Sequence, residues 1–129
     1  MASIERFEDI ESWKLGREVI GMIYSMTADG KFSRDFALCN QIRRASVSII
    51  SNIAEGFERG GNKEFVNFLA IAKGSCGEVR SQLYVALDQT YITVEQFDLV
   101  HSKLTETSRL IAGLIRYLQS SELRGSKFR

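Results

Sequence analysis

The stretch QIRRASVSIISNIAEGF, Gln41–Phe57, decides the fold class of this chain. Apolar residues recur in it at intervals of three and four, which places them on one face of an α-helix. Further apolar residues widen that face until only about 100° of the helix circumference is polar, although a bundle helix normally buries a narrower stripe. The excess predicts a second buried face, and hence a partner chain. The apolar residues concerned are Ile42, Ala45, Val47, Ile49, Ile50, Ile53 and Ala54.

Three further segments have the same helical period, and turn-forming sequences separate them at Asp29–Ser33, Glu58–Asn62 and Thr90–Thr93. A chain of 129 residues without proline is the size of one domain and permits long helices. Four amphipathic helices with short connections pack most simply as an up-down-up-down four-helix bundle. The sequence therefore predicts an all-α fold in a single domain, 1–129. Its helices are expected over about 8–28, 34–56, 63–89 and 94–120, followed by a flexible tail over 121–129.

Helix ends are predicted from residues that satisfy the unpaired backbone groups of a terminal turn. Ser33 and Asn62 are expected to cap the second and third helices. Thr93 and Gln96 have the spacing of a capping box at the start of the fourth. Gly56 is expected to end the second helix as its C-cap glycine.

The composition of the chain argues against several classes of protein. Lys and Arg number 17 against 16 Asp and Glu, so the net charge of +1 gives no overall attraction to nucleic acid or acidic membranes. The N-terminal sequence lacks the apolar region of a signal peptide, and no apolar run reaches the length of a membrane span. Cys39 and Cys76 have no CxxC spacing, which favours buried, reduced thiols. We expect a cytoplasmic protein with no membrane segment.

A seam of small side chains runs along the third predicted helix at spacings of four, three and four: Ala70, Gly74, Gly77 and Ser81. Each glycine inside a helix costs about 1 kcal/mol relative to alanine, so close approach of another backbone would explain the pair. Tolerated glycines at exposed positions are the alternative. The cations Lys63, Lys73 and Arg80 flank the seam, so it is equally suited to a phosphate backbone. One sequence does not separate a protein groove from a nucleic-acid groove.

Polar side chains on the second and third helices are candidates for a structural network. Antiparallel neighbours would align them, and Arg44 would then pair with carboxylates by directional guanidinium contacts. Such networks more often fix helix register or assembly than perform chemistry. The network residues are Gln41, Ser48, Asn52, Glu55, Glu64, Glu78 and Gln82.

Catalytic chemistry has little support in the sequence. The single histidine, His101, has only Asp98 at the spacing of a di-metal motif, and that motif requires two copies and two further glutamates. Glu55 and Glu78 are better explained as ion-pair partners than as paired catalytic acids. The glycine-rich GFERGG lacks the lysine and Ser/Thr of a phosphate-binding loop. We predict no catalytic residue, no metal site and no cofactor.

Two long patterns, QIRRASVSIISNIAEGFERG and NKEFVNFLAIAKGSCGEVRSQL, resemble the "four helix bundle protein" family over about residues 7–118. That family includes the proteins encoded in intervening sequences of bacterial 23S rRNA genes. It also includes the accessory variability determinant proteins of diversity-generating retroelements. The matching positions are Gln41, Arg43, Arg44, Ser48, Asn52, Glu55, Gly56, Glu64, Phe68, Lys73, Gly74, Ser75, Glu78 and Gln82.

The resemblance implies an up-down-up-down bundle assembled as a homopentameric barrel, without enzymatic activity. The retroelement proteins are strongly basic and bind nucleic acid and a reverse transcriptase, whereas this chain is nearly neutral. The leading hypothesis is a non-catalytic homo-oligomeric adaptor for RNA or another nucleic acid. Its contact candidates are Arg43, Arg44, Lys63, Lys73 and Arg80, with Arg43 foremost. The alternative is a protein–protein interaction scaffold in which the arginines form only structural pairs.

Overall fold

A computed structural model describes residues 4–127, with side chains described as far as Ser120. A 3₁₀ turn, η1 (Phe7–Asp9), precedes the helices. The helices are α1 (Glu11–Met26), α2 (Gly30–Arg34), α3 (Phe36–Glu58), α4 (Asn62–Asp88) and α5 (Val94–Lys127). Residues 4–127 contain no strand, and the prediction of an all-α fold is confirmed.

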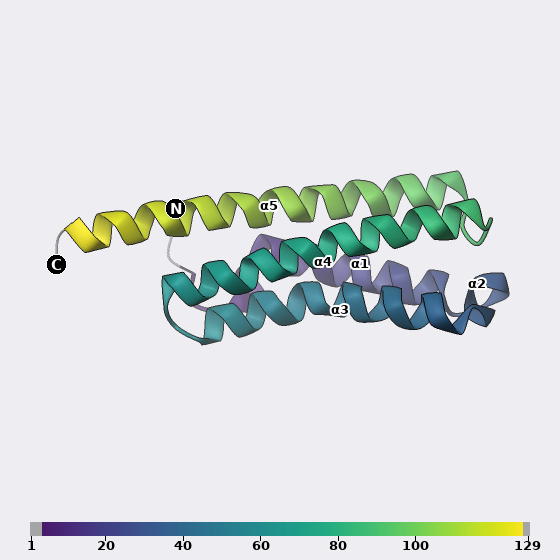
Figure 1. The fold of residues 1–129 in the computed structure, drawn as a ribbon, viewed down its shortest axis with the longest axis horizontal. Coiled ribbons are helices and arrows are strands. Elements are labelled where there is room, and N and C mark those ends of the chain that lie inside the picture. The colour runs from purple at the N-terminus through teal and green to yellow at the C-terminus, as the bar shows by residue number, and fades with distance from the viewer. Residues whose placement is uncertain (1–3, 128–129) are drawn as a thin grey trace.

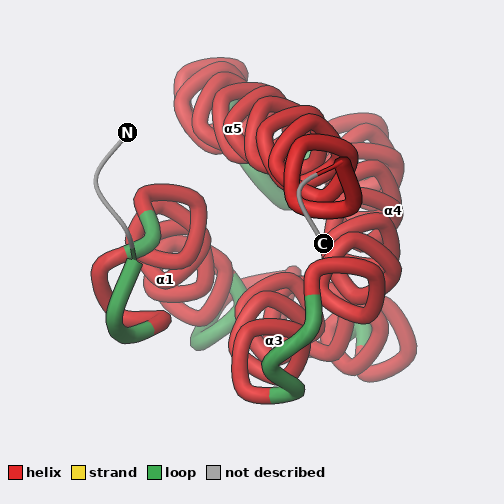
Figure 2. The backbone as a smooth tube through the Cα atoms, turned by 90° about the vertical axis from the view of Figure 1, so that its left-hand side faces the viewer, coloured by secondary structure: helices red, strands yellow, loops and turns green. Residues whose placement is uncertain are grey.

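The four long helices lie along one axis, and consecutive ones run in opposite directions (Figure 1). Viewed along that axis, α1, α3, α4 and α5 follow one another around the bundle in chain order (Figure 2). Each long helix packs against the next, and α1 also contacts α5, which closes the ring. Among the described residues no helix combines the length and the apolar character needed to cross a bilayer.

The core follows the bundle axis and consists of aliphatic side chains at helical spacing. Burial of each such side chain contributes about 1.5–3 kcal/mol to folding. Fully buried members are Val19, Ile23, Ile42, Ile49, Ile53, Leu69, Val79, Leu83, Leu104 and Ile111.

The wide apolar surface of α3 serves two neighbours within the chain. A Cβ on Gly16 of α1 would lie 2.8 Å from Ile50 Cγ2, so α1 approaches the flank of α3 closely. The core residues Ile49 and Ile53 face the bundle axis from the same helix. Ile50 therefore packs inside the chain and does not require a partner, whereas Val47 remains exposed.

The first predicted break, Asp29–Ser33, contains a helix of its own, α2. Phe32 is buried and stacks on Tyr91, with ring centroids 5.3 Å apart. Ser33 lies within α2 and its hydroxyl donates to Gly30 O, so the prediction that Ser33 caps the next helix is wrong. Asp35 has that role, because its Oδ1 accepts a hydrogen bond from Leu38 N at 3.1 Å. Its Oδ2 accepts from the Tyr91 hydroxyl at 3.0 Å.

The turn between α3 and α4 also differs from the prediction. Gly56 lies inside α3, which continues to Glu58, and the left-handed residue is Gly60 with φ +86°. Asn62 is the first residue of α4 and forms no side-chain cap, and its amide instead donates to Leu118 O at 3.5 Å.

Of the two predictions for the ends of α5, one is confirmed and the other is wrong. The capping box is confirmed: Thr93 Oγ1 accepts from Gln96 N at 3.1 Å, and Gln96 Oε1 accepts from Thr93 N at 2.9 Å. The prediction that the helix ends near residue 120 is wrong, because the backbone over 121–127 continues it. An established helix extends by one hydrogen bond per residue without needing an apolar stripe. The rest of the predicted tail, 128–129, lies outside the described residues.

Candidate interaction surface on α3 and α4

The small-residue seam lies on the solvent side of α4. No atom lies within 4 Å of a Cβ built on Gly74, and Gly77 meets only Arg80 Nη2 at 3.8 Å. Ala70 and Ser81 are exposed on the same side. No backbone of the described chain therefore approaches these glycines closely.

Large apolar side chains border the seam on the same arc of α4. Ile71 is 53% exposed, Tyr84 51% and Val85 44%. We call this surface the α4 outer face; it comprises Ala70, Ile71, Gly74, Gly77, Ser81, Tyr84 and Val85. An exposed strip that combines small residues with large apolar ones is typical of a contact surface for another molecule.

Three of the predicted nucleic-acid contacts are exposed. Arg44 on α3 and Lys63 and Lys73 on α4 reach solvent, and none forms an ion pair within the described part of the chain. Arg80 is half-buried, and its Nε is shielded from solvent without a hydrogen-bond partner there. Arg80 is thus placed at the edge of the α4 outer face, beside Gly77.

Arg43 is held by contacts inside the chain. Its Nε donates to Thr27 Oγ1 at 2.8 Å, and its guanidinium lies 4.4 Å from the centroid of the Tyr24 ring. A cation over an aromatic face gains about 0.5–2 kcal/mol. The structure thus places Arg43 at the junction of α1 and α3, where it links the two helices. Both partners lie in α1 or at its C-terminal cap, so no local sequence pattern indicated them.

Part of the predicted polar network forms a bridge between α3 and α4. The Ser48 and Ser75 hydroxyls are 2.9 Å apart, and Asn52 Nδ2 donates to Ser48 O at 2.8 Å and to Ser48 Oγ at 2.9 Å. Since the helices are antiparallel, this contact sets their register and brings Gln41 level with Gln82. Gln82 Oε1 is nevertheless buried without a partner among the described residues.

The predicted glutamates meet through an arginine that the sequence reasoning missed. Arg59 Nε donates to Glu55 Oε2 at 2.9 Å and its Nη1 to Glu64 Oε2 at 3.4 Å. The hydrogen bond and charge of Glu55 raise the pKa of Arg59. The i,i+4 spacing of Glu55 and Arg59 was the available signal. Within the described chain, Arg44 and Glu78 take part in no such pair.

The two cysteines and the single histidine are engaged in packing contacts, and the histidine is half-buried. Both cysteines are free and buried, and burial raises the pKa of the Cys76 thiol to about 11. His101 stacks on Phe97, with ring centroids 5.1 Å apart, and meets the edge of Tyr84 at 5.8 Å. No group of three or more His, Cys, Asp or Glu side chains suited to a metal ion occurs in the described residues.

Comparison with known proteins places the chain in a family. The family model described as 23S rRNA-intervening sequence protein matches residues 8–113. The chain belongs to this family. The resemblance inferred from the α3 and α4 motifs is therefore confirmed.

A solved relative has the same fold as this 23S rRNA-intervening sequence family member. This relative is a protein of unknown function from Bacteroides thetaiotaomicron that belongs to the S23 ribosomal protein family, and its crystal structure has been solved. The TM-score is 0.69 at 25% identity, and the alignment covers 81% of this chain and 94% of that one. The comparison with curated proteins gives no match. Neither the family description nor the solved relative indicates a catalytic activity.

Proposed function

We propose that this protein is a non-catalytic helical bundle that assembles with copies of itself, as a homopentamer, and acts in the cytoplasm as an adaptor for RNA. The observation that carries the proposal is the α4 outer face, where Gly74 stands in open space and Gly77 meets only the end of the Arg80 side chain, among exposed apolar side chains. Each glycine weakens the helix by about 1 kcal/mol, and nothing in the described chain compensates for it. A second copy packed on this face would supply the compensation.

The small side chains of the seam support self-association. Packed helices lie 8–10 Å apart depending on the side chains at their contact, and small residues give the lower end of that range. Ile71 and Val85 would then be buried against the neighbouring copy. The family resemblance supports five copies, because it implies a homopentameric barrel.

The RNA-binding part of the proposal rests on the exposed cations. Arg44, Lys63 and Lys73 have no ion-pair partner in the described chain and are therefore available for phosphates. One copy has almost no excess of positive charge, because 17 Lys and Arg stand against 16 Asp and Glu. A ring of copies repeats them, and linked weak contacts can raise the overall affinity by about 10²–10⁴. Arg43 and Arg80 are secondary candidates, since one is engaged with Tyr24 and the other is half-buried.

Mobility-shift titrations with RNA at about 50 and 200 mM salt test this proposal. We expect binding that weakens steeply as salt rises, and a shallower dependence for a triple variant Arg44→Ala, Lys63→Ala, Lys73→Ala. A matched triple variant on α1 and α2, Lys14→Ala, Arg17→Ala, Lys31→Ala, removes the same charge and should bind like the wild type. Absence of binding at the lower salt concentration would exclude the RNA role.

The second candidate is a protein–protein interaction scaffold. The contacts of Arg43 favour it, because the foremost predicted ligand contact is bound to Thr27 and Tyr24 inside the chain. In that case the assembled bundle binds another protein instead of RNA, and the exposed cations have no phosphate to contact. An oligomer that forms normally but shows no RNA binding at either salt concentration would support this candidate over the first.

A further inference from the structure

A cavity of about 680 Å³ opens between the N-terminal segment and the middle of α5, on the side of the bundle away from the α3–α4 contact. Its volume lies within the range of about 300–1,000 Å³ typical of small-molecule sites. Residues of η1, of the first turn of α1 and of α5 around Leu110 form its wall. Neither the polar network nor the α4 outer face contributes a residue to it.

The wall of this cavity is mainly apolar. Ile4 and Ile10 line it from the N-terminal segment, and Leu110 and Leu114 from α5. Gly113 lies between the two leucines, where a Cβ would meet only Arg116 Nη2 at 3.8 Å. The absent side chain therefore leaves room for an apolar body beside α5.

One hydroxyl in the wall has no hydrogen-bond partner. Ser12 is 2% exposed, and its Oγ is shielded from solvent without a partner in the described chain. Buried polar groups are nearly always hydrogen-bonded in folded proteins, and an unsatisfied one requires an explanation. A polar group of a ligand in the cavity would provide the missing bond once a small shift of the wall uncovers the Oγ atom.

The charged residues around the cavity are mostly acidic. Glu5, Asp9 and Glu11 line it together with a single cation, Arg109. Arg109 Nη1 already pairs with Glu106 at 3.0 Å. The charge balance of the wall therefore favours a cation over an anion.

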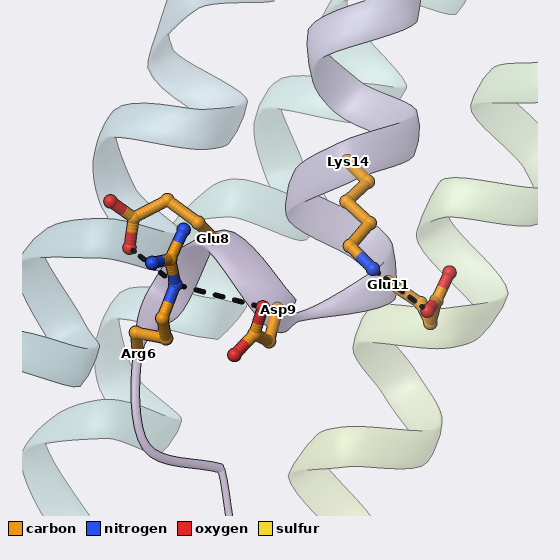
Figure 3. Close-up of polar contacts among 5 residues, drawn as sticks. All are labelled: Arg6, Glu8, Asp9, Glu11 and Lys14. Atoms are coloured by element: carbon orange, nitrogen blue, oxygen red, sulfur yellow. Dashed lines mark hydrogen bonds and ion pairs between the residues drawn. The ribbon is translucent and has the colours of Figure 1, made fainter.

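The carboxylates at the start of α1 are only weakly compensated. Arg6 Nε lies 3.6 Å from Asp9 Oδ1 and 3.8 Å from Glu8 Oε1, and Lys14 Nζ lies 3.4 Å from Glu11 Oε1. Figure 3 shows these side chains at the start of α1. All of them except Glu8 are at least half exposed, and ion pairs of this kind contribute little and exchange readily. Glu5 forms no ion pair with any described residue. A ligand cation would thus meet carboxylates that are free or easily freed.

We propose that this cavity binds a small apolar amine. The hydrocarbon part lies against Ile10, Leu110 and Leu114, and the ammonium group meets the carboxylates of the wall. The Ser12 hydroxyl accepts a hydrogen bond from the ligand nitrogen after a small local adjustment. This site is independent of the RNA contacts and of the assembly through the α4 outer face.

Three probes of equal chain length test the head-group preference: n-hexylamine, n-hexanol and n-hexanoate. Binding is followed by calorimetry and by the fluorescence of Trp13, the only tryptophan, which is next to Ser12. We expect hexylamine to bind most tightly and hexanoate least. Equal affinities for the amine and the alcohol, or tighter binding of hexanoate, would overturn the proposal.

Variants then locate the binding site. Gly113→Leu should abolish hexylamine binding by filling the cavity, whereas Gly21→Leu, placed on α1 with no atom within 4 Å, should leave it unchanged. The surface triple variant Glu5→Gln, Asp9→Asn, Glu11→Gln should bind hexylamine no better than hexanol and remains informative if Gly113→Leu fails to fold. Ser12→Ala should weaken hexylamine binding about tenfold, the effect of losing a hydrogen bond to a charged group. Undiminished binding by either the Gly113→Leu or the triple variant would refute the site.

Discussion

α3 and α4 approach each other closely at Gly56, and this contact allows a quantitative test by substitution. In Gly56→Ala the new Cβ would lie 2.7 Å from Phe68 Cβ, 3.0 Å from Phe65 Cδ1 and 3.3 Å from Phe65 O. Phe68 Cβ and Phe65 O are fixed to the α4 backbone, so a change of side-chain rotamer does not relieve the contact. The two helices must separate instead.

The expected magnitude combines two opposing effects. Inserting a methyl group into a packed contact costs about 1–3 kcal/mol, and replacing a helical glycine by alanine regains up to about 1 kcal/mol. Because backbone must move, we expect the upper part of the first range and a net loss of about 2 kcal/mol. For a chain of this length the melting temperature should fall by roughly 5–10 °C.

Urea and thermal unfolding monitored by circular dichroism measure this loss, at one fixed protein concentration because assembly makes stability concentration-dependent. Gly21→Ala is the matched control: it has the same gain in helix propensity and no atom within 4 Å, so it should stabilise the protein by about 1 kcal/mol. If Gly56→Ala proves as stable as Gly21→Ala, the close approach of the two helices is not a constraint and the reasoning fails.

Three further predictions concern single contacts. A double-mutant cycle of Ser48→Ala and Ser75→Ala should show a coupling of about 0.5–1.5 kcal/mol in urea unfolding, and additive losses would contradict their hydrogen bond. The free energy of unfolding should fall as pH rises from 9.0 to about 11, because the buried Cys76 thiol keeps its proton while the unfolded chain loses it. Cys76→Ala should flatten that part of the pH profile, and parallel profiles would exclude Cys76 as the cause. Thr93→Ala should lower the free energy of unfolding by about 1 kcal/mol through loss of the capping bond to Gln96, and an unchanged melting curve would refute the capping role.

Much of the fold was predictable because helical period and capping chemistry are local properties. The spacing of Ile42, Ile49 and Ile53 alone places a buried stripe on α3, and the structure confirms it. The Thr93–Gln96 capping box needs only a three-residue separation to be recognised. The outward position of Gly74 also follows from helical phase, once Leu69 and Cys76 are taken as core.

The errors arose where distant segments decide the outcome. Gly56 has the chemistry of a helix end, but its close contact with Phe68 on α4 gives it a different role within α3. Ser33 is a good capping residue by type, but α2 formed around Phe32 and left the cap to Asp35. Local pattern does not specify such contacts.

The candidate site likewise contains features that the sequence predicts and others that it does not. The residue types of the polar network were predictable, but not their partners, because these depend on helix register. Arg43 was expected to reach another molecule, whereas Thr27 and Tyr24, which engage it, are 16 and 19 residues away in the sequence. The unpartnered hydroxyl of Ser12 has no sequence signature at all, since only the packed structure shows that nothing in the described chain bonds to it.

Self-association through the α4 outer face is the central claim, and the molecular mass in solution tests it most directly. Light scattering of the wild type should give about five times the chain mass of 14.6 kDa. Gly74→Leu should give a smaller mass, because its side chain would prevent a second helix from approaching, while the α1 control Gly21→Leu should retain the full mass. A wild-type mass of 14.6 kDa, or a Gly74→Leu variant that assembles like the wild type, would contradict the claim.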